Sequence, residues 1–245
     1  MADYRWNELD NARGYDQAAE HVHPYYTQIQ DAILERLPLA AERPDWVIDL
    51  GGGSGRLAEG ILTIWPRAKV CVIDQSTAFL TLAEQRLARF GERAVCLAAR
   101  LQSNWSDQLP DRPRAIVSMS AIHHLDPLEK KALYAQAARC LAAGGVLMNG
   151  DEVRPVRDED YRAECRRWSE HMHRVMDAGL IPENLKDALR GWIARNVDAP
   201  LGPRTSGDDC HETAETQLGY FADAGLTSTQ VAWRRDLWAV LYGRK

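Results

Sequence analysis

The sequence predicts an α/β fold: an open, mostly parallel sheet of seven strands, ending in an antiparallel hairpin and covered by helices on both faces. Five short runs are apolar throughout, which is typical of parallel strands buried on both faces. These runs alternate with helix-like segments, and strand–helix repetition of this kind predicts a parallel sheet. The five runs cover residues 46–50, 69–74, 94–98, 115–119 and 145–149.

Between these strands, apolar side chains repeat at helical spacing. Residues 57–65, 79–90 and 128–141 show this pattern. Ser76 is suited to capping the N-terminus of the second helix, and Gly144 is suited to ending the third. The pattern therefore predicts one helix after each of the first, second and fourth predicted strands.

Two further strand-like runs, 227–233 and 237–242, close the chain. Only three residues separate them, so they are expected to form an antiparallel hairpin. Near the other end, one helix is predicted at about 26–37, after a tyrosine-rich segment. Residues from 153 to about 203 look helical and contain no strand, with a loop at 198–207.

We expect a single domain over 1–245. Within it, the predicted parts are an N-terminal helical lid (1–40), a core (41–152), a helical cap insertion (153–207), and a last helix with the terminal hairpin (208–245).

Composition excludes several classes of protein. Of 245 residues, 45% are hydrophobic and 27% charged, as in ordinary globular proteins. No apolar run reaches the ~18 residues of a membrane span, and the chain does not begin with a signal peptide's apolar core. The net charge of −5 does not favour a nucleic-acid partner. The five cysteines are scattered, without a Cys-x-x-Cys pair, so a reducing, cytoplasmic setting is expected.

A glycine-rich segment, 49–55, lies between the first predicted strand and the first predicted helix. It reads Asp-Leu-Gly-Gly-Gly-Ser-Gly. Glycines let the backbone turn tightly and approach a ligand, and the following helix offers free N–H groups. Asp74 ends the next strand, where a carboxylate can bind both hydroxyls of a ribose. Together these features predict an adenosine-type ligand at the switch point of the sheet.

The spacing of the glycines narrows the choice of ligand. It differs from the Gly-x-Gly-x-x-Gly of dinucleotide sites, and no Gly-Lys-Ser/Thr phosphate loop occurs. Asp49, beside the loop, would repel a pyrophosphate and would favour a ligand with a positive centre, such as a sulfonium or an ammonium.

These motifs resemble those of the class I S-adenosylmethionine (SAM) dependent methyltransferases, which have a Rossmann-like fold. Residues 49–55 resemble motif I of that family, and 74–76 resemble its second motif. Residues 122–127 are similar to the segment after its fourth strand, and 141–147 to its lead into strand five. With the terminal hairpin, the likeness covers about residues 25–150 and 208–245.

The resemblance implies that SAM is the cofactor. It implies binding roles for Tyr15, Asp49, Gly51, Gly52, Gly53, Gly55, Asp74, Gln75, Leu101 and Ser118. Asp74 would bind the ribose, Gln75 would lie beside the adenine, and Ser118 would face the methionine moiety through its backbone. Many relatives carry an acid after strand three, which is absent here, so an apolar contact from Leu101 is expected instead.

Two histidines, His123 and His124, follow the fourth predicted strand. Either ring could act as a general base if the methyl acceptor loses a proton, and an alternative is that they hydrogen-bond the backbone. No metal ion is expected. The pair His171 and His173 is unsuited to one, because residues two apart on a helix do not share a face.

The sequence thus predicts a SAM-dependent methyltransferase that acts on a small organic acceptor, without a nucleic acid or membrane partner and as a possible homodimer. Trp168, Met172, Met176 and Trp192 could cover the acceptor. One alternative is an enzyme like the carboxy-SAM synthases of tRNA modification, to which residues 23–26 and 125–133 are similar. Another is a non-catalytic SAM-binding or interaction protein.

Overall fold

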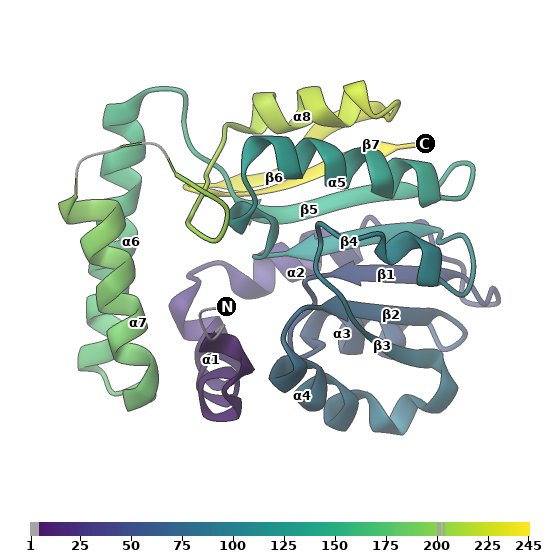
Figure 1. Cartoon of the computed structure of the whole chain (residues 1–245), viewed down its shortest axis with the longest axis horizontal. Helices are drawn as coiled ribbons and strands as arrows, with labels where there is room; N and C mark the ends of the chain where they lie inside the picture. Colours follow the sequence, from purple (N-terminus) through teal and green to yellow (C-terminus); the bar gives the residue numbers. More distant parts are fainter. Residues whose placement is uncertain (1–4, 200–201, 203) are drawn as a thin grey trace.

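A twisted sheet of seven strands runs through the computed structural model, which describes residues 5–199, 202 and 204–245 (Figure 1). The spatial order is β3-β2-β1-β4-β5-β7-β6. Strands β1 to β5 are parallel, and β7 is antiparallel to both of its neighbours, β5 and β6. The strands are β1 (Trp46–Leu50), β2 (Lys69–Asp74), β3 (Ala94–Ala98), β4 (Ala115–Met119), β5 (Val146–Glu152), β6 (Thr227–Arg235) and β7 (Trp238–Arg244). The predicted fold class is confirmed.

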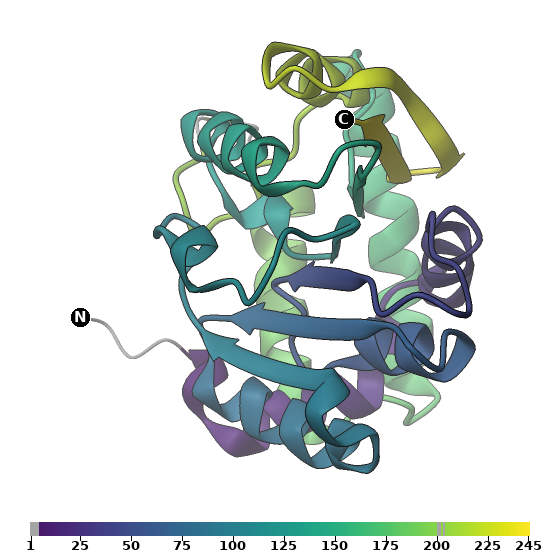
Figure 2. The same ribbon diagram turned by 90° about the vertical axis from the view of Figure 1, so that its right-hand side faces the viewer.

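Helices cover both faces of the sheet, as Figure 2 shows. One face carries α2 (Tyr26–Leu34), α3 (Arg56–Ile64) and α4 (Thr77–Leu87), and the other carries α5 (Pro127–Cys140) and α8 (Ala214–Asp223). Successive strand residues point to opposite faces, so Val47 packs in the first core and Ile48 in the second. Both faces are buried, which explains why the strands are apolar throughout.

Two predicted helix-end signals are present in the structure. Ser76 caps α4, because its hydroxyl accepts a hydrogen bond from the backbone N–H of Phe79. Gly144 has a positive φ of 70° and lies in the turn that follows α5. The cap fixes the direction in which the chain leaves β2, and this brings the end of that strand to the cavity described below.

The insertion after β5 is helical, as expected. It contains α6 (Asp158–Asp177), α7 (Glu183–Ile193) and a short π-helix, η5 (Ala194–Asp198). In Figure 1, α6 and α7 stand across the carboxyl ends of the parallel strands. In the predicted loop 198–207, residues 200, 201 and 203 lie outside the described part of the chain. The proposed boundaries of the lid and the cap stay predictions.

Two elements differ from the prediction. Bounds were predicted for one helix of the N-terminal helical lid, at about 26–37, and none for the tyrosine-rich segment before it, where α1 (Leu9–Val22) is a regular helix that packs on α4, α6 and α7. Strand β5 continues three residues beyond 149, because Asp151 and Glu152 are buried and held by polar partners rather than by solvent. Within the described part of the chain, no helix combines the length and the apolar character needed to cross a membrane.

Candidate active site

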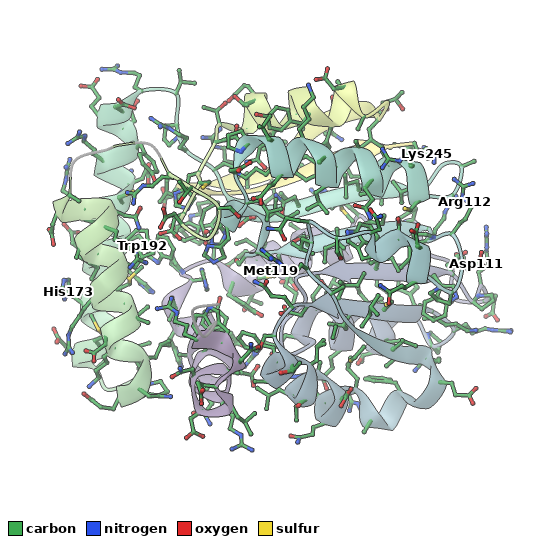
Figure 3. The ribbon with its side chains drawn as sticks, viewed as in Figure 1. Asp111, Arg112, Met119, His173, Trp192 and Lys245 are labelled. Atoms are coloured by element: carbon green, nitrogen blue, oxygen red, sulfur yellow. The ribbon has the colours of Figure 1, made fainter. Side chains whose placement is uncertain are left out.

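A cavity of about 670 Å³ opens at the carboxyl ends of β1, β2 and β4. We call its two ends the loop half, beside the glycine segment 51–53, and the cap half, under α6 and α7. In Figure 3, Met119 and Trp192, which both line the cavity, lie on the side of the cap, while Lys245 lies at the opposite end of the molecule. In open parallel sheets, ligands bind at this edge, at the point where the strand order reverses.

The glycine segment forms the wall of the loop half. Gly51 and Gly53 have positive φ values of 64° and 53°, and both line the cavity. A Cβ at Gly51 would collide with the side chain of Ala121. Gly52 also lines the cavity, and a Cβ there would lie 2.7 Å from Cγ of Asp49. The backbone can therefore approach a ligand only because these residues have no side chain.

Gly55 has a different role from the one expected. It is not among the residues that line the cavity. It precedes α3 with a φ of 78°, and a Cβ there would lie 3.1 Å from Leu87 of α4. Its small size therefore allows α3 and α4 to pack closely, which supports the loop from behind.

Asp74 is buried at the end of β2 and faces the loop half. One carboxylate oxygen accepts a hydrogen bond from the backbone N–H of Gly53 at 3.0 Å, and the other from that of Ser76 at 2.8 Å. A carboxylate has about four acceptor positions, so about two remain for a ligand. Burial raises the pKa of Asp74, and the backbone N–H groups oppose this rise. The arrangement fits a vicinal diol such as that of a ribose.

Asp49 is a second buried acid in the loop half, with 1% of its surface exposed. Neither carboxylate oxygen has a partner in hydrogen-bond geometry among the described residues. Burial and the charge of Asp74 raise the pKa of Asp49 to about 7, and the nearby backbone N–H of Ala58 opposes this rise. A buried carboxylate without a donor is costly unless a ligand supplies one, so this position fits the cationic end of SAM.

Three more predicted contacts line the cavity: Tyr15, Gln75 and Leu101. Ser118 is not among the residues that line the cavity; its side chain is fully buried and its hydroxyl donates to the carbonyl oxygen of Leu50 at 2.8 Å. The next residue, Met119, does line the cavity. The expected backbone contact of Ser118 with the methionine moiety stays a prediction.

Aromatic and apolar side chains from the insertion cover the cap half. Trp168, Met172 and Trp192 line it, and the two indole rings meet edge to face with centroids 4.2 Å apart. Met176, which was expected here, packs in the core instead. The indole N–H of Trp168 donates to the carbonyl oxygen of Val22 at 2.8 Å, which joins the insertion to α1.

Histidines and carboxylates form the floor of the cap half. The Nδ1 atom of His123 lies 2.7 Å from an oxygen of Asp151 and 2.8 Å from one of Glu152. Burial lowers the pKa of His123, but the charges of Glu152 and Asp151 outweigh this and hold the pKa well above its ordinary value. The ring of His124 is 4.0 Å from that of His123, and burial followed by the charge of His123 lowers the pKa of His124. Both predicted histidines line the cavity.

Several residues of this floor were missed by the sequence analysis. His23 lies 3.5 Å from Glu152, and its other ring nitrogen is 2.9 Å from the hydroxyl of Tyr15. Asp209 lines the cavity and comes from the loop before α8, together with His211, whose Nε2 lies 3.6 Å from Glu152. The segment 208–212 contains three acids, a cysteine and a histidine in five residues, and this density was the available signal.

Comparisons with known proteins agree with this geometry. Residues 47–145 match a family model described as a methyltransferase domain. A release factor glutamine methyltransferase of Bordetella pertussis is 42% identical over 74 residues, which are 29% of this chain and 26% of that protein. A malonyl-[acyl-carrier protein] O-methyltransferase of Geobacter sulfurreducens is 27% identical over 184 residues, 69% of this chain and 63% of the relative. The chain spans less than two thirds of the length of these relatives.

Solved structures share the fold. An O-methyltransferase family protein from Burkholderia thailandensis has a TM-score of 0.66 and 18% identity, over 100% of this chain and 63% of its own. Other similar structures are complexes with SAM or with S-adenosylhomocysteine (SAH). The family match, the strand order and the paired acids Asp49 and Asp74 agree. Residues 47–145 therefore carry a methyltransferase domain, and the fold is that of the class I, SAM-dependent methyltransferases.

Proposed function

We propose that this chain transfers a methyl group from SAM to a small organic acceptor that binds in the cap half. One observation carries the proposal: a single cavity joins a loop half with two buried acids to a cap half closed by aromatic side chains. A cofactor in the first half and an acceptor in the second would thus meet without crossing a wall of protein.

In the loop half, this chain's own residues would hold SAM. Asp74 would accept hydrogen bonds from the two ribose hydroxyls with its free acceptor positions. Asp49 would accept from the ammonium group, which supplies the donor that its buried carboxylate lacks. Leu101 and Gln75 would contact the adenine side, and Tyr15 would close the cavity from α1. SAM supplies the activated methyl group on its sulfonium.

In the cap half, the protein would orient the acceptor and exclude water. Trp168, Met172 and Trp192 offer an apolar surface that a flat or aliphatic acceptor can contact. His123 and His124 lie on the floor, where they would contact the polar group of the acceptor. Because the leaving group is already activated, positioning and desolvation supply most of what the reaction needs.

The relatives support an oxygen acceptor, since two of them are named as O-methyltransferases. The carboxy-SAM alternative needs a cationic group reserved for an additional carboxylate, and no observation assigns that role to one of the residues that line the cavity. No observation favours a non-catalytic SAM-binding protein. We therefore propose methyl transfer as the activity.

Two measurements test this function. Isothermal titration of the full chain with SAM and with SAH should show saturable binding, and mass spectrometry should detect SAH formation when a panel of phenols, carboxylic acids and amines is added. Binding with no turnover across the panel would support a SAM-binding protein without this activity. Absence of both would contradict the proposal, and a co-purified carboxylated SAM would favour the alternative.

A further inference from the structure

Three side chains with metal-ligand atoms meet on the floor of the cap half: His123, His124 and Asp209. Their ligand atoms all lie within 4.8 Å of one another, and all three residues line the cavity. His123 and Asp209 are more than nine-tenths buried. They come from two segments that are 85 residues apart along the chain, the turn after β4 and the loop before α8.

The distances between these atoms are informative. Nε2 of His123 is 3.9 Å from an oxygen of Asp209, and Nδ1 of His124 is 3.8 Å from the same oxygen. Both separations are too long for a hydrogen bond. In a tetrahedral site with bonds of about 2.0–2.1 Å, ligand atoms are about 3.4 Å apart. A contraction of about half an ångström would bring each imidazole nitrogen to that separation from Asp209, and the two nitrogens lie within 4.8 Å of each other.

His123 and Asp209 are each oriented by a hydrogen-bond partner of the kind that commonly orients metal ligands in proteins. Asp151 holds Nδ1 of His123 at 2.7 Å, which directs Nε2 toward Asp209. Asn196, in the π-helix η5, donates to the second oxygen of Asp209 at 2.7 Å. Metal-binding imidazoles and carboxylates are commonly oriented by such second partners, and π-helical turns occur often at functional sites.

The two segments are also fixed to each other through the backbone. The N–H of Cys210 donates to the carbonyl oxygen of His123, and the N–H of Gly207 to that of His124, each at 2.8 Å. Nδ1 of His124 is 3.3 Å from the carbonyl oxygen of Asp208, a long contact that a metal bond would replace. The two segments that carry the three side chains are therefore held next to each other before any ion binds.

A second group of possible metal ligands, His123, Asp151 and Glu152, lies on the other side of His123, but its histidine already has both acids within hydrogen-bond distance. There, Nδ1 of His123 is within hydrogen-bond distance of both Asp151 and Glu152, so a shared proton satisfies those atoms. On the Asp209 side, no hydrogen bond joins the three side chains. The Asp209 side is therefore where an ion could bind without displacing a hydrogen bond between two of its side-chain ligands.

We propose that His123, His124 and Asp209 bind a divalent transition-metal ion, of which Zn²⁺ is the test case. Two imidazoles and one carboxylate suit Zn²⁺ or Fe²⁺ better than Mg²⁺, which prefers oxygen ligands. Binding displaces any proton on Nε2 of His123 to solvent, and the proton that Nδ1 of His124 donates to the carbonyl oxygen of Asp208 moves to Nε2 of the same ring, which leaves Nδ1 free to bind the ion. The group faces the cavity, so the remaining coordination positions are open to water or to an oxygen of the acceptor, which the ion would polarise. The site differs from the metal-free one expected from the sequence, and it does not depend on the proposed function.

Metal content and spectroscopy test the site without any assay of activity. The full chain is stripped with a chelator, titrated with Zn²⁺ and analysed by calorimetry and elemental mass spectrometry, and then reloaded with Co²⁺ for its visible absorption. We expect about one ion per chain and a Co²⁺ spectrum typical of mixed nitrogen and oxygen ligands. His124→Ala and Asp209→Ala should each reduce affinity at least 100-fold, and Asn196→Ala about 10- to 100-fold.

His173→Ala is the matched control, because this histidine is exposed on α6 and does not line the cavity (Figure 3). It should bind Zn²⁺ as tightly as the unaltered chain does. Equal Zn²⁺ affinity in Asp209→Ala, His124→Ala and the control would overturn the proposal, as would the absence of binding to a folded, unaltered chain. Circular dichroism and SAM titration of each variant establish that it is folded. If SAM does not bind but Zn²⁺ does, the proposed function fails and the metal site stands.

Discussion

The two halves of the cavity hold their buried acids in different ways. In the loop half, Asp74 is held by backbone N–H groups, and Asp49 has no donor among the described residues. In the cap half, Asp151 and Glu152 are held by His123, and Asp209 by Asn196. Asp74 in the loop half is therefore positioned by the backbone, whereas the acids of the cap half are positioned by other side chains.

This difference has consequences for what each half can do. A backbone-built site is the same for every chain that makes the same turn, and it suits a cofactor that is shared by many enzymes. A site built from side chains of α1, β5, η5 and the loop before α8 can be changed one residue at a time, and it suits an acceptor that differs between enzymes. The variants below test this contrast, from the largest expected effect to the smallest.

The largest effect is expected for Asp74→Ala in the loop half. It removes a charged acceptor for two ribose hydroxyls and leaves the N–H groups of Gly53 and Ser76 without their partner. Charge-assisted hydrogen bonds contribute about 1.5–3 kcal/mol each, so SAM binding should weaken by about 3 kcal/mol, roughly 100-fold. Calorimetric titration measures this. Asp223→Ala, an exposed acid of α8, is the control, and equal affinity in the two variants would show that Asp74 does not bind the ligand.

Gly51→Ala should cause the next largest loss of SAM affinity. Comparing it with a second glycine variant separates the cost of the positive φ from the cost of the steric collision. The φ of 64° disfavours a Cβ by about 1–2 kcal/mol, and the Cβ would in addition collide with Ala121. Gly179→Ala has a similar φ of 69° but no atom within 4 Å of the added Cβ, so it carries the conformational cost alone. We expect both variants to lower the melting temperature, and Gly51→Ala alone to weaken SAM binding at least 10-fold. A similar loss of SAM affinity in Gly179→Ala would mean that SAM affinity responds to the stability of the whole fold rather than to the collision of the added Cβ with Ala121.

The same contrast explains how much of the molecule could be predicted. The first four strands match the predicted bounds, because each is a short apolar run, and β1, β2 and β4 are almost wholly buried. The loop half is local in sequence, so its glycines and Asp74 were found, except that Met119 lines the cavity without having been predicted and that Gly55 packs between helices. These two exceptions depend on packing against neighbours, which spacing does not report.

The cap half could not be assembled in the same way. Its members come from α1, β5 and the loop before α8, and only tertiary contacts bring them together. Glu152 was placed outside β5, because an acid at the end of an apolar run is read as the end of a strand. It is buried since three histidines, His23, His123 and His211, approach its carboxylate. Helix α1 was missed because most of its side chains are polar or charged and its buried face is made mostly of alanine, which leaves only a weak apolar pattern.

Asp49 predicts a pH dependence of cofactor binding. Its pKa is raised to about 7 by burial and by the charge of Asp74, so the ligand-free acid is largely protonated below neutrality. A cationic ligand favours the carboxylate, so SAM must displace the proton at low pH, and its affinity should fall up to about 10-fold per pH unit below 7 and level off above. Titration calorimetry in two buffers with different ionisation enthalpies measures the proton released.

Asp49→Asn should abolish the step near pH 7 and weaken binding at higher pH. The pH dependence of the stability of the ligand-free chain tests independently whether folding raises the pKa of Asp49. Because the folded pKa of Asp49 is raised, its contribution to stability is present below about pH 3.8 and lost as the pH rises through about 7. The Asn variant should therefore melt at a higher temperature than the unaltered chain above pH 7. An unchanged pH profile of SAM affinity in this variant would assign the dependence to another group.

The smallest effect is expected in the cap half, for Trp168→Phe. The variant keeps an aromatic ring against Trp192 but loses the hydrogen bond from the indole N–H to Val22, which joins the insertion to α1. One neutral hydrogen bond contributes about 1 kcal/mol, so KM for the acceptor should rise about fivefold while the Kd for SAM stays within about twofold. Trp233→Phe, on β6 and outside the cavity, is the control. A change in SAM affinity larger than the change in acceptor KM would mean that the two halves are coupled through α1, and the contrast between a backbone-built and a side-chain-built half would then not extend to function.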